Sequence, residues 1–268
     1  MAKNNTFSRG EINRGWEAII NDILDPRSQA FITNNGLMQG QRILEVGSGN
    51  GILTCWLAKE VGPEGKVVGV EANGELVKAS EELAKELHLK NVSFQVASVR
   101  DLSNFEGQFD LVFNRLLLLN LLDPSYALIE MKNCLVPGGT IICEDFIHSH
   151  CFTDPPFKAF HRFMDIFTKL MDMFGKDVDF GKHLPSALVK AGFADININL
   201  YQPLLLDPEH KVIVRVGLEY MKKDLIAYNV LTEQDVDAII SELSRGERDR
   251  NSFWVGSSVC QVSGKKII

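Results

Sequence analysis

Basic charge is scarce in this chain. The 28 Lys and Arg residues face 35 Asp and Glu residues, which leaves a formal net charge of −7. A nucleic-acid partner requires a basic face that neutralises phosphates, and the sequence has only short basic pairs such as Lys222-Lys223 and Lys265-Lys266. We therefore expect no nucleic-acid partner.

Long apolar runs are also missing. No stretch approaches the roughly 20 apolar residues of a membrane-spanning helix, and no apolar signal segment follows the polar start MAKNNTFSRG. The five cysteines are odd in number and scattered, which argues against a disulfide framework and for a reducing compartment. We expect a cytoplasmic protein without a membrane span.

Metal-ligand spacing is lacking as well. The nearest approach to a metal motif is His148-Ser149-His150-Cys151. Ligands so close together in the chain are hard to arrange tetrahedrally without a distant fourth one. The sequence therefore predicts no metal site.

What the sequence does contain is an alternation of strand and helix patterns. Short apolar runs predict strands, and the segments between them carry helical periodicity. The predicted strands are 42–46, 66–71, 92–96, 109–113 and 140–144, and the helices are 52–61, 75–89 (Leu76, Ala79, Leu83 and Leu87 on one face) and 124–135. This alternation predicts an α/β fold, a doubly wound parallel sheet with helices on both faces and a ligand crevice at the carboxyl edge of the strands.

The second half is less regular. It predicts helices over 185–191 and 232–245, the latter opened by the capping pattern Thr232-x-x-Asp235, and strands over 194–201 and 253–262. Half of the sixteen phenylalanines lie between Phe146 and Phe180, and many of them form an apolar stripe on a helix predicted over 157–174. Such a stripe is typical of core packing, but an apolar lid over a ligand would show the same pattern.

The most informative segment is Glu45-Val46-Gly47-Ser48-Gly49-Asn50-Gly51, between a predicted strand and a predicted helix. Glycines let a backbone turn sharply and approach a ligand closely. A dinucleotide fingerprint would read G-x-G-x-x-G, but here the third glycine comes one residue early, at Gly51. The spacing favours a ligand other than a pyrophosphate.

An acidic residue, Glu71, ends the second predicted strand. It lies 71 − 47 = 24 residues after Gly47. A carboxylate at this position accepts hydrogen bonds from the two hydroxyls of a ribose. The segment therefore predicts a nucleoside-bearing cofactor.

At this point the chain resembles a known family. The motifs RILEVGSGNG, KVVGVEA, FDLVFNRLLLLNL and LVPGGTIICEDF are similar, in order and spacing, to those of class I S-adenosylmethionine-dependent methyltransferases, in particular the small-molecule group that includes ubiquinone/menaquinone-type enzymes. The resemblance implies a seven-stranded, mostly parallel Rossmann-like sheet whose last strand is antiparallel. We expect residues 1–40, which precede the first strand, to form an N-terminal segment that is helical in part, and residues 41–268 to form a methyltransferase domain with helical insertions, one of them a lid, at about 146–184 and 205–247.

The resemblance also implies roles for individual residues toward S-adenosyl-L-methionine. The backbone of Gly47, Ser48 and Gly49 would pass beside the methionyl and ribose parts, and Glu45 would hold the methionyl ammonium. The remaining implied contacts are Glu71 to the ribose, Ala72 and Val99 to the adenine, Ser98 (where the family usually has Asp) to the adenine amino group, and the carbonyl of Asn114, just after the fourth strand, to the methionyl amine.

The implied reaction is methyl transfer to a small, partly apolar acceptor. The cofactor brings the reactivity, so a strong protein base is not required. Asp145 and His148, with His150, follow the fifth predicted strand and are the candidates if a base exists. Two alternatives stay open: a protein that binds S-adenosylmethionine without catalysis, and a nicotinamide-dependent oxidoreductase. The acceptor and the oligomeric state are not indicated.

Overall fold

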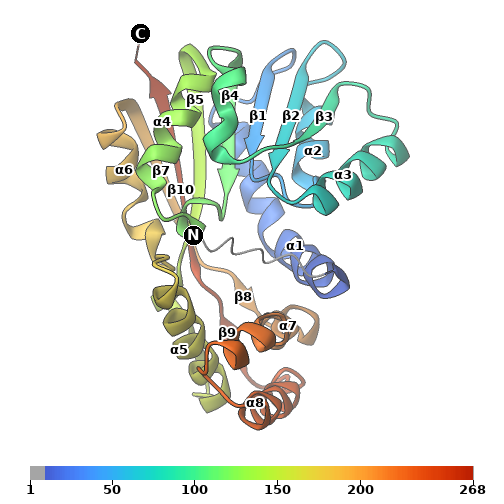
Figure 1. The fold of residues 1–268 in the computed structure, drawn as a ribbon, viewed down its shortest axis with the longest axis vertical. Helices are drawn as coiled ribbons and strands as arrows, with labels where there is room; N and C mark the ends of the chain where they lie inside the picture. Colours follow the sequence, from blue (N-terminus) through green and yellow to red (C-terminus); the bar gives the residue numbers. More distant parts are fainter. Residues whose placement is uncertain (1–9, 268) are drawn as a thin grey trace. The chain divides into compact units, whose positions relative to one another are not determined.

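The computed structural model describes residues 10–267, which form two compact units (Figure 1). The sheet unit comprises Asp25–Phe146, Asp179–Leu200 and the described residues from Val259 onward. The helical unit comprises the described residues up to Leu24, together with Ile147–Val178 and Tyr201–Ser258. Helix α1 (Gly10–Asn34) contributes residues to both units.

The sheet unit is built on seven strands in the order β3-β2-β1-β4-β5-β10-β7. Neighbours from β3 through β5 pair in parallel, whereas β10 runs against β4 and β5 in Figure 1. The strands are β1 (Arg42–Val46), β2 (Lys66–Glu71), β3 (Val92–Val96), β4 (Phe109–Arg115), β5 (Leu135–Ile147), β7 (Phe193–Tyr201) and β10 (Ser258–Lys266). This confirms the predicted doubly wound fold, and strand order reverses between β1 and β4.

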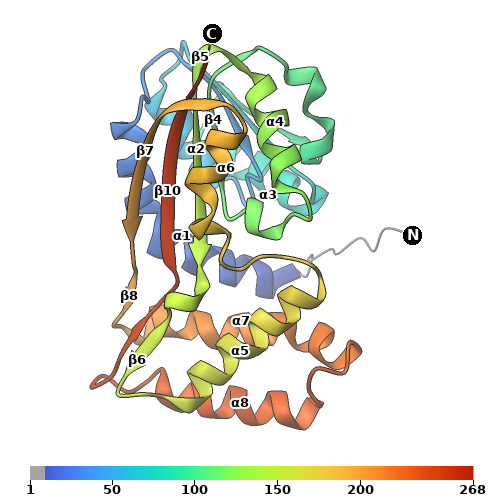
Figure 2. The ribbon, with the colours of Figure 1, turned by 90° about the vertical axis from the view of Figure 1, so that its left-hand side faces the viewer.

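Helices cover both faces of this sheet (Figure 2). The buried side chains Phe31 and Ile32 of α1 and Leu57 of α2 share one apolar cluster with the sheet residues Ile43 and Phe113. On the other face, Met131 of α4 contacts the side chain of Asn114 in β4. The helices of this unit, besides part of α1, are α2 (Ile52–Glu60), α3 (Gly74–Glu86), α4 (Pro124–Cys134) and α6 (Leu184–Lys190).

Local sequence explains where the helices begin. The Asn73 side chain accepts a hydrogen bond from the N–H of Glu75 at the start of α3, which satisfies one of the amides that a helix leaves open at its N-terminus. Asp123 caps α4 in the same way, with Pro124 at its first turn. The predicted capping box at Thr232 is confirmed, because Thr232 and Asp235 bond each other's backbone N–H.

The apolar face predicted for α3 is only partly buried. Leu83 packs against the cluster that includes Val77, Ala84 and Phe94, whereas Leu87, on the same predicted face, is 38% exposed. The middle of α3 approaches the glycine loop closely, because a Cβ on Gly51 would lie 2.6 Å from the Ser80 side chain. Only small residues of α3 fit at that distance.

The helical unit has its own core. The phenylalanine stripe of α5 (Lys158–Met173) packs with α7 (Pro208–Ala227) and α8 (Glu233–Gly246). The members of this core include Phe160, Phe163, Leu170, Leu218, Met221, Leu225, Val236, Ile239 and Leu243. This contact supports the core-packing interpretation of the stripe, and the lid interpretation stays a prediction.

A small antiparallel sheet, β6-β9-β8, completes the helical unit. Its strands are β6 (Phe152–Asp154), β8 (Leu204–Leu205) and β9 (Phe253–Val255). The single strand predicted over 253–262 is therefore wrong, because it is divided between β9 and β10. The division falls at Gly256, whose N–H bonds the carbonyl of Pro203.

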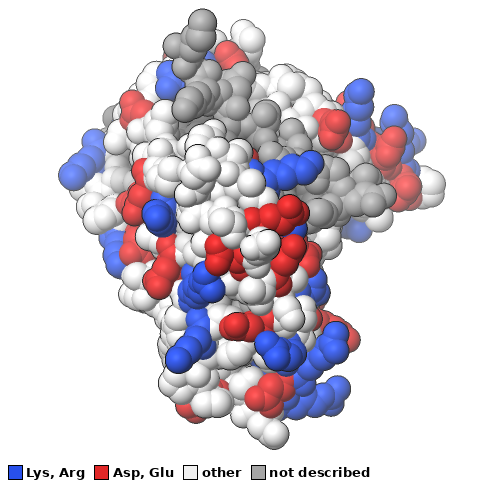
Figure 3. Space-filling view, turned by 60° about the horizontal axis from the view of Figure 1, so that its bottom comes forward, with Lys and Arg blue, Asp and Glu red and all other residues white. Residues whose placement is uncertain are grey.

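Two sequence-based expectations concern the surface charge and membrane-spanning helices. On the face drawn in Figure 3, the described basic side chains stand among acidic ones. Within residues 10–267, no helix is both long and apolar enough to cross a membrane.

Candidate functional site: the carboxyl edge of the sheet

The glycine loop lies between β1 and α2, where strand order reverses. Gly47, Gly49 and Gly51 have φ values of 79°, 53° and 75°, a region that residues with a Cβ rarely adopt. Gly51 has a second constraint, because a Cβ there would also lie 2.9 Å from the Phe94 ring. The alternating glycines of the sequence are therefore required by the backbone of this turn.

The loop amides bond within the protein. The N–H groups of Gly47 and Ser48 both donate to the carbonyl of Val70, at 2.8 and 3.1 Å, and that of Gly51 donates to the carbonyl of Ser48 at 2.9 Å. The N–H of Gly49 donates to the Glu71 carboxylate at 3.3 Å. A pyrophosphate site uses such amides as its donors, so this arrangement argues against a dinucleotide.

Glu71 lies at the end of β2, as predicted, beside the loop. Besides Gly49, its carboxylate accepts the N–H of Asn73 at 2.9 Å. The side chain is half-buried, and Ala72, the next residue, is exposed. Carboxylate oxygens accept more than one hydrogen bond each, so Glu71 can serve the loop and a ligand hydroxyl together.

Glu45 is a second carboxyl of the site, and it is buried. It accepts the hydroxyl of Thr54 in α2 at 2.5 Å. Burial raises the pKa of Glu45 to about 8, while the Thr54 hydrogen bond and the charge of Arg115 lower it and Asp25 and Glu144 raise it. A cationic ligand beside this carboxyl would lower its pKa, because the cation stabilises the ionised form.

Ser98 and Val99 follow β3 and begin a 3₁₀ helix, η1 (Val99–Phe105). The Ser98 hydroxyl accepts a hydrogen bond from the N–H of Arg100 at 3.2 Å. The backbone N–H of Ser98 donates to the Asp101 carboxylate. Ser98 thus caps η1, a role that the sequence analysis missed. Its hydroxyl keeps a donor and a second lone pair for another partner.

The end of β4 differs from the prediction. Asn114 was expected just after the strand, but it lies inside β4, paired with Cys143 of β5. Its amide is fully buried and donates to the Cys143 sulfur at 2.9 Å. The residue that leaves the strand is Leu116, which has a left-handed φ of 53°.

The turn after β4 lies against the glycine loop. A Cβ placed on Gly47 would be 3.4 Å from Cδ1 of Leu117, so the two segments approach closely. The Asn120 side chain donates to the Leu116 carbonyl at 2.9 Å and stabilises this turn. Asn120 had no predicted role.

The candidate bases are also placed differently from the prediction. Asp145 lies inside β5 and is fully buried, so the expectation that it follows the strand is wrong. His148 and His150 do follow β5, in the 3₁₀ helix η3 (His148–His150) of the helical unit. Their rings bond the hydroxyls of Ser257 and Ser258, at 3.1 and 2.9 Å. Among the described residues, no group of three or more His, Cys, Asp or Glu side chains is placed to hold a metal.

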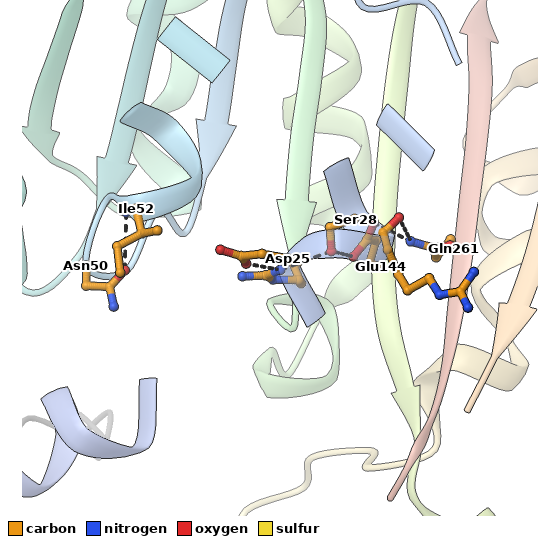
Figure 4. Close-up of polar contacts among 8 residues, drawn as sticks. Asp25, Ser28, Asn50, Ile52, Glu144 and Gln261 are labelled. Atoms are coloured by element: carbon orange, nitrogen blue, oxygen red, sulfur yellow. Dashed lines mark hydrogen bonds and ion pairs between the residues drawn. The ribbon is translucent and has the colours of Figure 1, made fainter. Parts of the chain in front are cut away.

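A buried polar network that joins α1, β4, β5 and β10 was not predicted (Figure 4). Arg115, the last residue of β4, pairs with Asp25 of α1 at 2.8 Å and donates to Ser28 at 3.0 Å. Ser28 donates to Glu144 of β5 at 2.6 Å, and Gln261 of β10 donates to the same carboxyl at 2.8 Å. The sequence signals were weak: Glu144 ends the strand predicted at 140–144, and Arg115 lies just beyond the one predicted at 109–113.

Comparison with known proteins agrees with this geometry. The family described as "Methyltransferase domain" matches residues 37–187. That match covers more than half of the chain and includes the loop, Glu71 and β4. The chain belongs to this family. Its seven-stranded sheet and motifs are those of the class I, S-adenosylmethionine-dependent methyltransferases.

Two curated relatives illustrate the range of the match. An uncharacterised methyltransferase of Schizosaccharomyces pombe is 43% identical over 110 residues, which cover 39% of each chain. A demethylmenaquinone methyltransferase of Staphylococcus carnosus is 32% identical over 138 residues, which cover 52% of this chain and 54% of that protein. The chain thus spans about half of the length of these two relatives, or less.

Solved structures share the fold of this methyltransferase chain. A SAM-dependent methyltransferase from Aquifex aeolicus has a TM-score of 0.52 and 20% identity, over 71% of this chain and 91% of that one. The [4+2]-cyclase SpnF has a TM-score of 0.57 and 17% identity, over 90% and 81% of the two chains. At this identity the likeness concerns the fold alone.

The residues of the site fit S-adenosylmethionine. The Glu71 carboxylate is held at the loop and can accept further hydrogen bonds from hydroxyl groups, and the buried Glu45 is compatible with a cationic amino group. The internally bonded amides of Gly47, Ser48 and Gly49 leave a neutral wall rather than a phosphate cradle.

Proposed function

We propose that this protein binds S-adenosyl-L-methionine at the carboxyl edge of β1, β2 and β4 and transfers its methyl group to a small, partly apolar acceptor. The observation that carries the proposal is the hydrogen bond from the Gly49 N–H that holds the Glu71 carboxylate on the glycine loop. The N–H groups of Gly47, Ser48 and Gly51 in the same loop bond backbone carbonyls of the protein. Membership of the methyltransferase-domain family supports the reaction.

When bound, the cofactor supplies a methyl carbon that its sulfonium has already made electrophilic. Glu71 accepts the ribose hydroxyls, and Glu45 holds the ammonium of the methionyl end as an anion. Ala72, Ser98 and Val99 line the adenine. The backbone of Gly47, Ser48 and Gly49 borders the methionyl and ribose parts, and the backbone carbonyl of Asn114 accepts from the methionyl amine.

Catalysis then depends on placing the acceptor in line with the methyl carbon. Good alignment is worth effective molarities of about 10⁵–10⁸ M, so the protein does not need a strong base. His148 and Asp145 stay the candidates if the acceptor must lose a proton early. The relative named for demethylmenaquinone supports a small organic acceptor, and the five free thiols support a reducing, cytoplasmic location.

The test begins with the protein as purified. Native mass spectrometry identifies a retained nucleoside, and incubation with deuterated-methyl S-adenosylmethionine and a small-molecule extract labels any acceptor. We expect bound S-adenosylmethionine or S-adenosylhomocysteine and an acceptor heavier by one labelled methyl group. Cofactor binding without a labelled product from any extract would favour the non-catalytic alternative.

A further inference from the structure

Arg115 stands among three carboxyls at the edge of the sheet. Its guanidinium contacts Asp25 at 2.8 Å and Ser28 at 3.0 Å, and Ser28 links it to Glu144. Arg115 and Glu144 are register partners on β4 and β5, while Glu45 lies on β1, which pairs with the other side of β4. Only about a tenth of the Arg115 side chain is exposed, so water screens its positive charge only weakly.

Each element packed around Glu45 contributes to its surroundings. Helix α2 provides the Thr54 hydroxyl and the Cys55 thiol, and the positive charge comes from Arg115 of β4. The negative groups are Asp25 of α1 and Glu144 of β5. Glu45 is thus a buried carboxyl whose ionisation is favoured by one cation and opposed by two other acids.

We propose that Arg115, fixed by Asp25 and Ser28, is a positioning residue that keeps Glu45 available as an anion for the ammonium end of the cofactor. This inference rests on the proposed function, in which Glu45 holds that ammonium. Arg115 itself touches Asp25 and Ser28, and acts on the cofactor through Glu45.

The physical reason is the opposition between burial and charge. Burial favours the neutral form of Glu45, and a neutral carboxyl attracts an ammonium far less than a carboxylate does. The positive charge of Arg115 counters burial, and the negative charge of Asp25 limits that effect. Removing the two charges one at a time should therefore move the ionisation of Glu45 in opposite directions, which loss of packing alone would not do.

The experiment measures the affinity for S-adenosylhomocysteine from pH 6 to 9 by calorimetry. The affinity should rise with pH as Glu45 ionises. At higher pH it should fall again as the ligand's own ammonium loses its proton, and this fall is common to all variants. Arg115→Gln should move the rising midpoint up by about one pH unit and weaken binding about tenfold at neutral pH. Asp25→Asn should move the midpoint down.

Three controls isolate the charge effect. Arg115→Lys keeps the charge and should restore the midpoint to near the wild-type value. Ser28→Ala removes one of the two contacts that fix Arg115 but no charge, so any shift of its midpoint should be smaller than that of Arg115→Gln. 5′-Methylthioadenosine lacks the amino-acid end, so its affinity should not follow the rising limb in any variant.

The outcomes separate this inference from the proposed function. If wild type binds neither S-adenosylhomocysteine nor 5′-methylthioadenosine, the proposed function fails. If wild type binds both, but Arg115→Gln and Asp25→Asn shift the midpoint in the same direction or not at all, the role of Arg115 is overturned. If Arg115→Gln does not fold, the same decision rests on Arg115→Lys and Asp25→Asn: an unshifted Asp25→Asn midpoint overturns the proposal.

Discussion

Glu71 and Gly49, 22 residues apart in the chain, are joined by a hydrogen bond of 3.3 Å from the Gly49 N–H to the Glu71 carboxylate. The other carboxylate oxygen accepts the N–H of Asn73 at 2.9 Å. The acidic end of β2 therefore holds both the glycine loop and the start of α3. A ligand that meets this carboxylate meets a group whose position is already fixed, which lowers the cost of ordering on binding.

Replacing Glu71 tests this arrangement. Glu71→Ala should weaken S-adenosylhomocysteine binding by about 2–4 kcal/mol, because two charge-assisted bonds to the ribose are lost, while the circular dichroism spectrum stays that of a folded protein. Glu75→Ala, an exposed acid in the first turn of α3, is the matched control and should leave the affinity unchanged. Equal affinities for Glu71→Ala and wild type would remove Glu71 from the site.

The glycine loop offers a test of packing with its own control. Gly51→Ala would force a left-handed φ on alanine and bring its Cβ within 2.6 Å of Ser80. Gly62→Ala has a similar φ of 70° but meets nothing within 4 Å, so it reports the conformational cost alone, about 1 kcal/mol. Gly51→Ala should lower the free energy of unfolding by about 1–3 kcal/mol more than Gly62→Ala. Equal losses in urea unfolding would contradict the close approach of α3.

The raised pKa of Glu45 should make the free energy of unfolding depend on pH. Its pKa rises from 4.5 to about 8 on burial, so between these values the folded state binds more protons than the unfolded state. The free energy of unfolding should therefore fall as pH rises through this window, by up to about 1.4 kcal/mol per pH unit. Above about pH 8 the effect of this group is complete.

Glu45→Gln should flatten that dependence in the ligand-free protein and raise its stability at pH 7.5, while weakening cofactor binding. Urea unfolding at several pH values from 5 to 8.5 checks this. Glu144, whose pKa burial also raises, leaves a residual slope in the variant. An identical slope in variant and wild type would mean that Glu45 is already ionised in the folded protein.

His148 should be mainly structural. It is buried, its ring bonds Ser257 and its centroid lies 4.8 Å from that of Phe167. We expect His148→Ala to lower the free energy of unfolding by about 1–3 kcal/mol and the exposed His150→Ala to cost less. With an acceptor in hand, turnover should fall less than about tenfold in both. A fall of 10² or more in His148→Ala, at unchanged cofactor affinity, would instead identify a general base.

Local patterns sufficed for the sheet and the loop, because each depends on neighbouring residues. The apolar runs at 42–46 and 66–71 are strands, and the glycines between β1 and α2 adopt the backbone that only glycine favours. Glu71 was found for the same reason, since the pattern that predicts where β2 ends also identifies the residue at that end.

The errors arose where distant segments decide the outcome. Strands β4 and β5 run beyond their apolar stretches, which puts Asn114 and Asp145 inside the ladder. The Arg115–Asp25 pair joins residues 90 positions apart (115 − 25 = 90), and no local spacing indicates it. The division of the last strand depends on Pro203, which meets Gly256 only in the folded chain.

The central claim is that the glycine loop and Glu71 form a site for S-adenosylmethionine rather than for a dinucleotide. Calorimetry of the wild-type protein with S-adenosylmethionine, S-adenosylhomocysteine and NAD under one set of conditions tests it most directly. The account predicts saturable binding of the first two ligands and no detectable heat with NAD, because the bonded loop amides are not available to a pyrophosphate. Tight binding of NAD, with no response to S-adenosylmethionine or S-adenosylhomocysteine, would contradict it.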